Sequence, residues 1–145
     1  MVWKWVKGAA TARADFGDPL SGTDYALCVY DGNQSLVAHG CAPAGGTCGD
    51  RPCWRATSTG FKYRDREVGP GGLMNSFQLV LKAGVAGQAK IGAVGKGQTP
   101  SVPSLPLAQP VTVQLVNSDG AACWEAMYSA PALANDSAGF KDKAD

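Results

Sequence analysis

Residues 111–128 read VTVQLVNSDGAACWEAMY, and this stretch decides the fold class. Apolar side chains at Val111, Val113 and Leu115 alternate with their neighbours, which is the two-residue period of a strand with one buried face. The polar run Asn117–Gly120 follows, and Asp-Gly between two alternating segments is a strong signal for a β-hairpin. Cys123–Tyr128 supplies the returning strand. The stretch therefore predicts an antiparallel strand pair.

The same alternation recurs along the chain and predicts an all-β protein. It is found at Trp3–Trp5, Tyr25–Tyr30, Phe61–Arg64, Phe77–Lys82 and Ala89–Ala93. Eight or nine short strands, with turns about 8–12 residues apart, are typical of an antiparallel β-sandwich of Greek-key or jelly-roll type. Both faces of Tyr25–Tyr30 are apolar, so we expect a central strand that is covered by the second sheet and by a loop.

The length and charge of the chain limit its organisation and its partners. The 145 residues suit one domain, which we place at residues 1–130, with a polar and loosely held tail at 131–145. Four prolines before the hairpin predict a long connection between the sheets: Pro100, Pro103, Pro106 and Pro110. The net charge is only +1 and the longest basic run is Lys62–Arg66, so we expect no nucleic-acid partner. No apolar stretch is long enough for a membrane span.

Five cysteines predict a domain stapled by disulfides, with an odd thiol left over. The tight loop between Cys48 and Cys53 can bring these two within bonding reach. Cys28 and Cys123 lie in strand-like runs, and a bridge closing so long a loop is worth roughly 4–5 kcal/mol. Cys41 then lies outside both disulfides. A Cys41–Cys48 pairing is the competing connectivity.

Metal and catalytic chemistry find weak support in the residue pattern. Cys48 and Cys53, with His39 and Cys41 nearby, lack the second ligand pair of a zinc site, so we expect no cofactor. Glu125 is expected to face solvent from an edge strand or to pair with an arginine; the alternative is a position on an inward face, where burial would raise its pKa. We assign no catalytic residue. Four loop aspartates leave a structural calcium open beside ordinary turn chemistry: Asp15, Asp18, Asp24 and Asp31.

Aromatic side chains are the candidate ligand-binding residues, because the faces of sugar rings stack on aromatic rings. We name Trp3, Trp5, Trp54 and Tyr63. Trp3 and Trp5 share one face of a terminal strand, where they form either part of the core or a stacking platform. That strand, Val2–Lys7, is also a candidate edge for pairing with another copy.

Several blocks of the sequence resemble an uncharacterised module found at the ends of secreted or surface proteins of environmental bacteria. They are WKW at 3–5, KGAAT at 7–11, DFGDP at 15–19, LCVYD at 27–31, APAGGTC at 42–48, PCW at 52–54, GFKY at 60–63, LKAG at 81–84, PVTVQL at 110–115 and FKDK at 140–143. The resemblance covers nearly the whole chain. The sequence departs from the module at Cys41, where a residue other than cysteine is expected. It implies export and an appended role, with no established activity.

Together these observations predict a non-catalytic extracellular or cell-surface binding module with a polysaccharide ligand. The N-terminus lacks the apolar segment of a signal peptide, so an export signal would lie outside this chain. Two alternatives remain: a structural subunit that associates with itself through an edge strand, and a small hydrolase using His39, Cys41 or Glu125.

Overall fold

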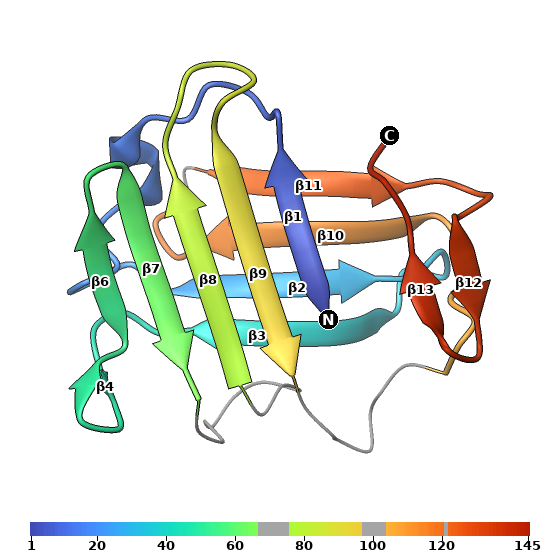
Figure 1. Ribbon diagram of the computed structural model, residues 1–145, viewed down its shortest axis with the longest axis horizontal. Helices are drawn as coiled ribbons and strands as arrows, with labels where there is room; N and C mark the ends of the chain where they lie inside the picture. The colour runs from blue at the N-terminus through green and yellow to red at the C-terminus, as the bar shows by residue number, and fades with distance from the viewer. Residues whose placement is uncertain (67–75, 97–103, 121) are drawn as a thin grey trace.

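The computed structural model describes residues 1–66, 76–96, 104–120 and 122–145. Two antiparallel sheets with nine strands between them pack face to face (Figure 1), which confirms the predicted all-β sandwich. Within the described ranges there is no α-helix, and the one helical turn is the 3₁₀ segment η1, Arg13–Phe16. Pro100 and Pro103 of the predicted connection lie outside the described residues.

The first sheet has five strands and contains the N-terminal strand at one edge. Its strands in spatial order are β1 (Val2–Val6), β9 (Lys90–Lys96), β8 (Ser76–Lys82), β7 (Gly60–Asp65) and β6 (Trp54–Thr57). The strands β6 to β9 follow one another as a meander, and β1 then pairs with the outer side of β9. Strand β1 is therefore an edge strand, as the sequence predicts.

The second sheet has four strands, which run across those of the first sheet in Figure 1. Their spatial order is β11 (Cys123–Tyr128), β10 (Val111–Asn117), β2 (Tyr25–Tyr30) and β3 (Leu36–Ala42). The predicted hairpin is present as β10 and β11, with Val111 opposite Tyr128. Strand β2 is central, but its outward side chains Ala26, Cys28 and Tyr30 are only half-buried, so the expected burial of both faces is not found.

Large rings from both sheets fill the core between them. The ring of Tyr25 on β2 lies 5.6 Å from that of Trp54 on β6, and Trp54 lies 5.1 Å from Tyr63 on β7, measured between ring centroids. Phe16 of η1 is completely buried against Trp124 on β11. Aromatic pairs at these separations stabilise a fold by more than the burial of their surface area alone. The inward-facing aromatic side chains therefore hold the two sheets together.

One of the two predicted disulfides is present. Cys48 and Cys53 are bonded, with a Cα separation of 4.9 Å, and they flank the small hairpin of β4 (Thr47–Cys48) and β5 (Arg51–Pro52). The predicted Cys28–Cys123 bridge is wrong, and both residues are thiols. Strand β10 lies between their strands, so the bridge would have to span about 10 Å, beyond disulfide reach. Cys41 lies outside any disulfide, as predicted.

The C-terminal segment is bound to the sandwich instead of lying loose. It forms a hairpin of β12 (Ala134–Asp136) and β13 (Gly139–Lys141). The side chain of Asn135 accepts a hydrogen bond from the backbone N–H of Leu107 at 2.8 Å and donates one to its carbonyl at 2.7 Å. The ring of Phe140 packs edge-on against Tyr128 at 6.3 Å. This segment thereby covers part of the β11 end of the sandwich.

Candidate functional site

Two of the four aromatic candidates are core residues and present no ring face to solvent. Trp54 and Tyr63 are 2% and 4% exposed, and they lie opposite each other on β6 and β7. The indole N–H of Trp54 donates to the carbonyl of Pro43 at 2.7 Å. Burial, reinforced by Asp65, raises the pKa of Tyr63 to about 12. The expectation that these rings bind a ligand is corrected, because the strand register turns both of them inward.

Trp3 and Trp5 line an open groove at the edge of the sandwich. Both point inward from β1; Trp3 is buried, whereas Trp5 is half-buried. The Trp5 ring lies directly against the Cα of Gly8, where any side chain would collide with it. The groove has a volume of about 1360 Å³ and runs between β1, strands β10 and β11, and the C-terminal segment. These two predicted residues therefore lie at the same cleft.

The groove combines an apolar floor with a charged rim. Val29, Val113 and Tyr128 belong to the floor and are buried in the core. The rim contains four lysines and three carboxylates: Lys4, Lys7, Lys141, Lys143, Glu125, Asp142 and Asp145. A pocket with aromatic walls and a few polar groups at its mouth is typical of a small-molecule or sugar site. Tyr128, Phe140 and the rim lysines were not identified from the sequence, in part because Phe140, Lys141 and Lys143 belong to a segment that reads as a loose tail.

Trp3 and Tyr128 meet at the floor of this groove. The indole Nε1 of Trp3 is buried and has no hydrogen-bond partner among the described residues. Burial raises the pKa of Tyr128; the nearby Trp3 indole opposes this rise without reaching hydrogen-bond geometry, and Asp142 adds to it. An unpartnered buried donor costs about 1–3 kcal/mol. The Trp3 N–H is therefore shielded from solvent and lies near Tyr128.

Three thiols and the only histidine share the outer face of the four-stranded sheet. Cys28 of β2 lies opposite His39 of β3 on one side and Gln114 of β10 on the other. Cys41 and Cys123 belong to the adjoining row of the same face, which runs through Ala26 and Val116. The predicted Cys41 thiol is therefore one member of a neutral, thiol-bearing face.

Cys41 and Cys123 are in surroundings that favour the protonated thiol. Burial raises the pKa of Cys41, and Cys28 raises it further. Burial also raises the pKa of Cys123, with smaller contributions from Glu125 and Cys28. Cys28 likewise raises the pKa of Tyr30, two residues along the same strand face. A thiol is nucleophilic as the thiolate, so a raised pKa makes a poor nucleophile at neutral pH.

The residues named for a hydrolase do not converge on one pocket. Glu125 lies on the outer face of the edge strand β11, which agrees with the expected solvent-facing position, and it accepts a hydrogen bond from the side chain of Gln114. His39 lies on β3, at the other edge of the sheet, about 14 Å away by strand spacing. His39 is half-buried in a strand, and its Nδ1 has no hydrogen-bond partner in the described part of the chain.

The four loop aspartates accept hydrogen bonds from backbone N–H groups, three of them within local turns and Asp24 from a residue 20 positions along the chain. Asp15 accepts from the N–H of Ala12 at 2.7 Å, and Asp24 accepts from the N–H of Ala44 at 2.7 Å. Asp18 and Asp31 likewise accept from backbone N–H groups two or four residues further on. This is the turn chemistry that aspartate favours. Within the described ranges, no three His, Cys, Asp or Glu side chains are grouped in a way that could hold a metal ion.

Comparison of the chain with family models, with curated proteins and with solved structures finds no match. In the part of the chain that the structure describes, no helix has the length and apolar character needed to cross a membrane. The groove beside β1 is a cavity lined by described residues of both large sheets and of the C-terminal segment.

Proposed function

We propose that this chain is a non-catalytic binding module of an exported protein and that its ligand is a polysaccharide segment lying in the groove beside β1. The single observation that carries the proposal is the groove itself, about 1360 Å³, with Trp5 in its wall, Tyr128 at its floor, and lysines and carboxylates at its rim. Apolar ring surfaces with a few polar groups around them suit a sugar, which has apolar C–H faces and a hydroxyl periphery. The disulfide is compatible with export to an oxidising compartment.

The charged rim of the groove supports a ligand rich in oxygen. Lys4, Lys7 and Asp145 at the rim supply the charged donors and acceptors that sugar hydroxyls bind. An aliphatic ligand would leave these groups unsatisfied, so the mixture favours a carbohydrate.

The test is a binding screen of the purified, oxidised chain against soluble and insoluble polysaccharides. Wild type is expected to be retained by at least one polymer, and Trp5→Ala is expected to weaken that retention about tenfold, since it removes a groove wall. Leu20→Ala is the matched control, because Leu20 is 44% exposed and lies outside the groove. Failure to bind any polysaccharide, or equal loss in both variants, contradicts the proposal.

Self-association through β1 is the second candidate, favoured by one observation. Strand β1 pairs on one side only, and its outward residues Val2 and Val6 are 66% and 52% exposed. A second copy could extend the sheet from this edge. Lys4, midway along β1, opposes this because edge lysines discourage pairing. Sizing chromatography over a concentration series separates the two candidates: the polysaccharide module remains monomeric, and the structural subunit shifts to larger species.

A further inference from the structure

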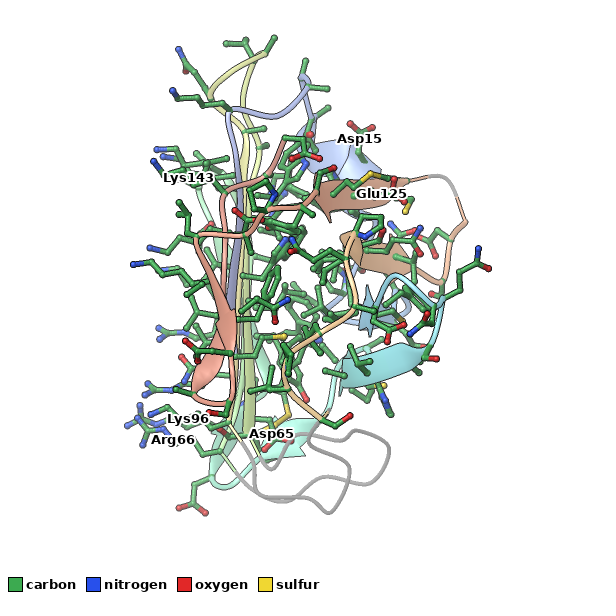
Figure 2. The ribbon with its side chains drawn as sticks, turned by 90° about the vertical axis from the view of Figure 1, so that its right-hand side faces the viewer. Asp15, Asp65, Arg66, Lys96, Glu125 and Lys143 are labelled. Carbon is green, nitrogen blue, oxygen red and sulfur yellow. A yellow bond between two sulfur atoms is a disulfide. The ribbon has the colours of Figure 1, made fainter. Side chains whose placement is uncertain are left out.

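The outer face of the five-stranded sheet gathers more than half of the positive charge of the chain. The described strand positions that point outward from this sheet include seven of the 13 lysines and arginines, all exposed: Lys4, Arg55, Lys62, Arg64, Lys82, Lys90 and Lys96. None of the described strand positions on this face has a carboxylate. We call these seven residues the basic face. Figure 2 shows nitrogen-tipped side chains projecting from this side, with Lys96, Arg66 and Lys143 among them, while Asp15 and Glu125 lie on the other side.

The cations of the basic face lie close enough to repel one another. Arg55 is directly opposite Lys62, and Lys82 is directly opposite Lys90. Opposed side chains have Cβ atoms about 4.5–5.5 Å apart, and like charges there are destabilising. This is shorter than the Debye length of about 8 Å at physiological salt, so salt does not remove the repulsion. A fold that retains two such pairs loses stability locally, which is typical of a functional surface.

The four residues of these pairs come from four consecutive strands, as two pairs that are offset from each other. Arg55 and Lys62 lie on β6 and β7, and Lys82 and Lys90 lie on β8 and β9. Lys62 is opposite Val80 and Lys82 is opposite Gly60, so the two pairs are displaced by two residues along the strands. Cations at successive places across the sheet suit a linear polymer that carries spaced negative charges.

The basic face and the groove share strand β1. Lys4 points outward from β1 into the basic face and also lines the rim of the groove. Lys143, at the rim of the groove, lies on the same side of the molecule as Lys96 in Figure 2. The two surfaces therefore adjoin at β1, where Lys4 belongs to both.

We infer that the ligand is an acidic polysaccharide, whose carboxylate or sulfate groups are held by the basic face while neighbouring sugars occupy the groove. This inference rests on the proposed function and adds the chemical class of the polymer. Single-stranded nucleic acid is disfavoured because no described strand position of this face has an aromatic ring for base stacking. A broad sheet does not enter the grooves of a duplex. A lipid surface is disfavoured because interfacial binding uses Trp, Phe or Leu, and the outward apolar residues of these strands are valines.

The test uses polygalacturonate and its methyl ester, which have the same backbone and differ in charge. Calorimetric titrations at about 0.01 M and about 1 M salt, where the Debye length falls about tenfold, measure the affinity of the chain for each polymer. We expect the acid form to bind at least about tenfold more tightly than the ester at low salt. That preference is expected to vanish at high salt.

Two charge-reversal variants show which surface of the chain binds polygalacturonate. Lys82→Glu is expected to lower the affinity for polygalacturonate about tenfold while the melting temperature stays the same or rises, since the repulsion with Lys90 becomes attraction. Arg51→Glu changes the net charge equally from the small hairpin outside both large sheets and is expected to leave the affinity within about twofold. A purely structural role for Lys82 predicts the opposite, a lower melting temperature.

The outcomes separate the inference from the proposed function. Equal binding of the ester and the acid, sensitive to Trp5→Ala but not to Lys82→Glu, overturns the inference and leaves the groove proposal standing. Binding to neither polymer and to no other polysaccharide overturns both. Tighter binding to vesicles containing an anionic phospholipid, or to duplex DNA, than to polygalacturonate at the same salt concentration also overturns the inference, in favour of that partner.

Discussion

The two sheets obey the same alternation rule on their inner faces but differ sharply on their outer faces. Outward positions of the five-stranded sheet include seven cations. The corresponding positions of the four-stranded sheet are nearly neutral, with Cys28, His39, Gln114 and Cys123 among them and Glu125 as the one carboxylate on its strands. The molecule is therefore polarised across its thickness although its net charge is only +1.

This difference separates what builds the fold from what the fold displays. The inner faces join through rings such as Tyr25 and Trp54, which contact across the sheets. Neither sheet needs a particular outer face for that packing. Opposed like charges on one outer face lower the stability of the sheet, so the concentration of cations there points to a role in ligand recognition. On the neutral face, the raised pKa of Cys41 and Cys123 makes these thiols poor nucleophiles.

The largest effect on stability is expected from a substitution in the core, on which both outer faces depend. Trp54→Ala is expected to lower the free energy of unfolding by about 3–5 kcal/mol, because the side chain is 2% exposed and contacts rings of both sheets. Val80→Ala, on the exposed basic face, is expected to change it by less than about 0.5 kcal/mol. Urea denaturation measures both; a similar cost for the two variants would contradict the assignment of inner and outer faces.

An identical substitution on opposite faces sharpens the contrast. A side chain at Gly40, which points inward on β3, would meet ring carbons of Phe77 at 2.9 Å, so Gly40→Ala is expected to cost about 1–3 kcal/mol. Gly92 points outward on β9 into open space, so Gly92→Ala is expected to stabilise by up to about 1 kcal/mol. Thermal denaturation followed by circular dichroism gives the sign of each change. The same sign for both would show that the sheet faces are assigned incorrectly.

Charge reversal on the basic face gives a smaller change in stability. Lys82→Glu places a carboxylate opposite Lys90, and an opposite-charge pair in this position contributes roughly 0.2–1 kcal/mol. The gain is expected to shrink in high salt because both groups are exposed. Lys82→Gln removes the repulsion without adding attraction and is expected to lie between wild type and Lys82→Glu in urea denaturation. A loss of stability in both variants would contradict the proposed repulsion.

Thiol chemistry tests the neutral face, where the expected energetic effect is smallest. Titration of the unfolded, unreduced chain with Ellman's reagent is expected to find three thiols, with Cys48–Cys53 intact. In the folded chain Cys123, which is exposed, should react first. Since Glu125 contributes to the raised pKa of Cys123, Glu125→Gln is expected to speed that reaction at neutral pH. A count of one thiol would restore the Cys28–Cys123 bridge that the register excludes.

Strand positions were predictable from the sequence because alternation and turn residues are local signals. The hairpin of β10 and β11 follows directly from Asp119–Gly120 and the alternating runs on either side. The order of strands within each sheet depends on contacts between residues that are far apart in the sequence. That order is the source of the wrong disulfide prediction. The position of β10 between Cys28 and Cys123 removed the predicted disulfide.

The candidate site was only partly visible for the same reason. Trp3 and Trp5 were identified from their own alternation, whereas Tyr128 and Phe140 join them only after the C-terminal segment folds back. The basic face is built from residues on five strands, far apart in the sequence and without a long basic run. A search for charge runs cannot find such a face; counting the outward position of each predicted strand could have found most of it.

The most direct test of the central claim is the pattern of amide chemical-shift changes when short polygalacturonate fragments are titrated into the ¹⁵N-labelled chain. The account predicts changes along β7, β8 and β9, at Lys62, Lys82 and Lys90, and at Lys4 on β1, with the outer positions of β2 and β10 unchanged. Changes centred on Cys28 and Gln114, or binding without any change on the five-stranded sheet, would contradict it.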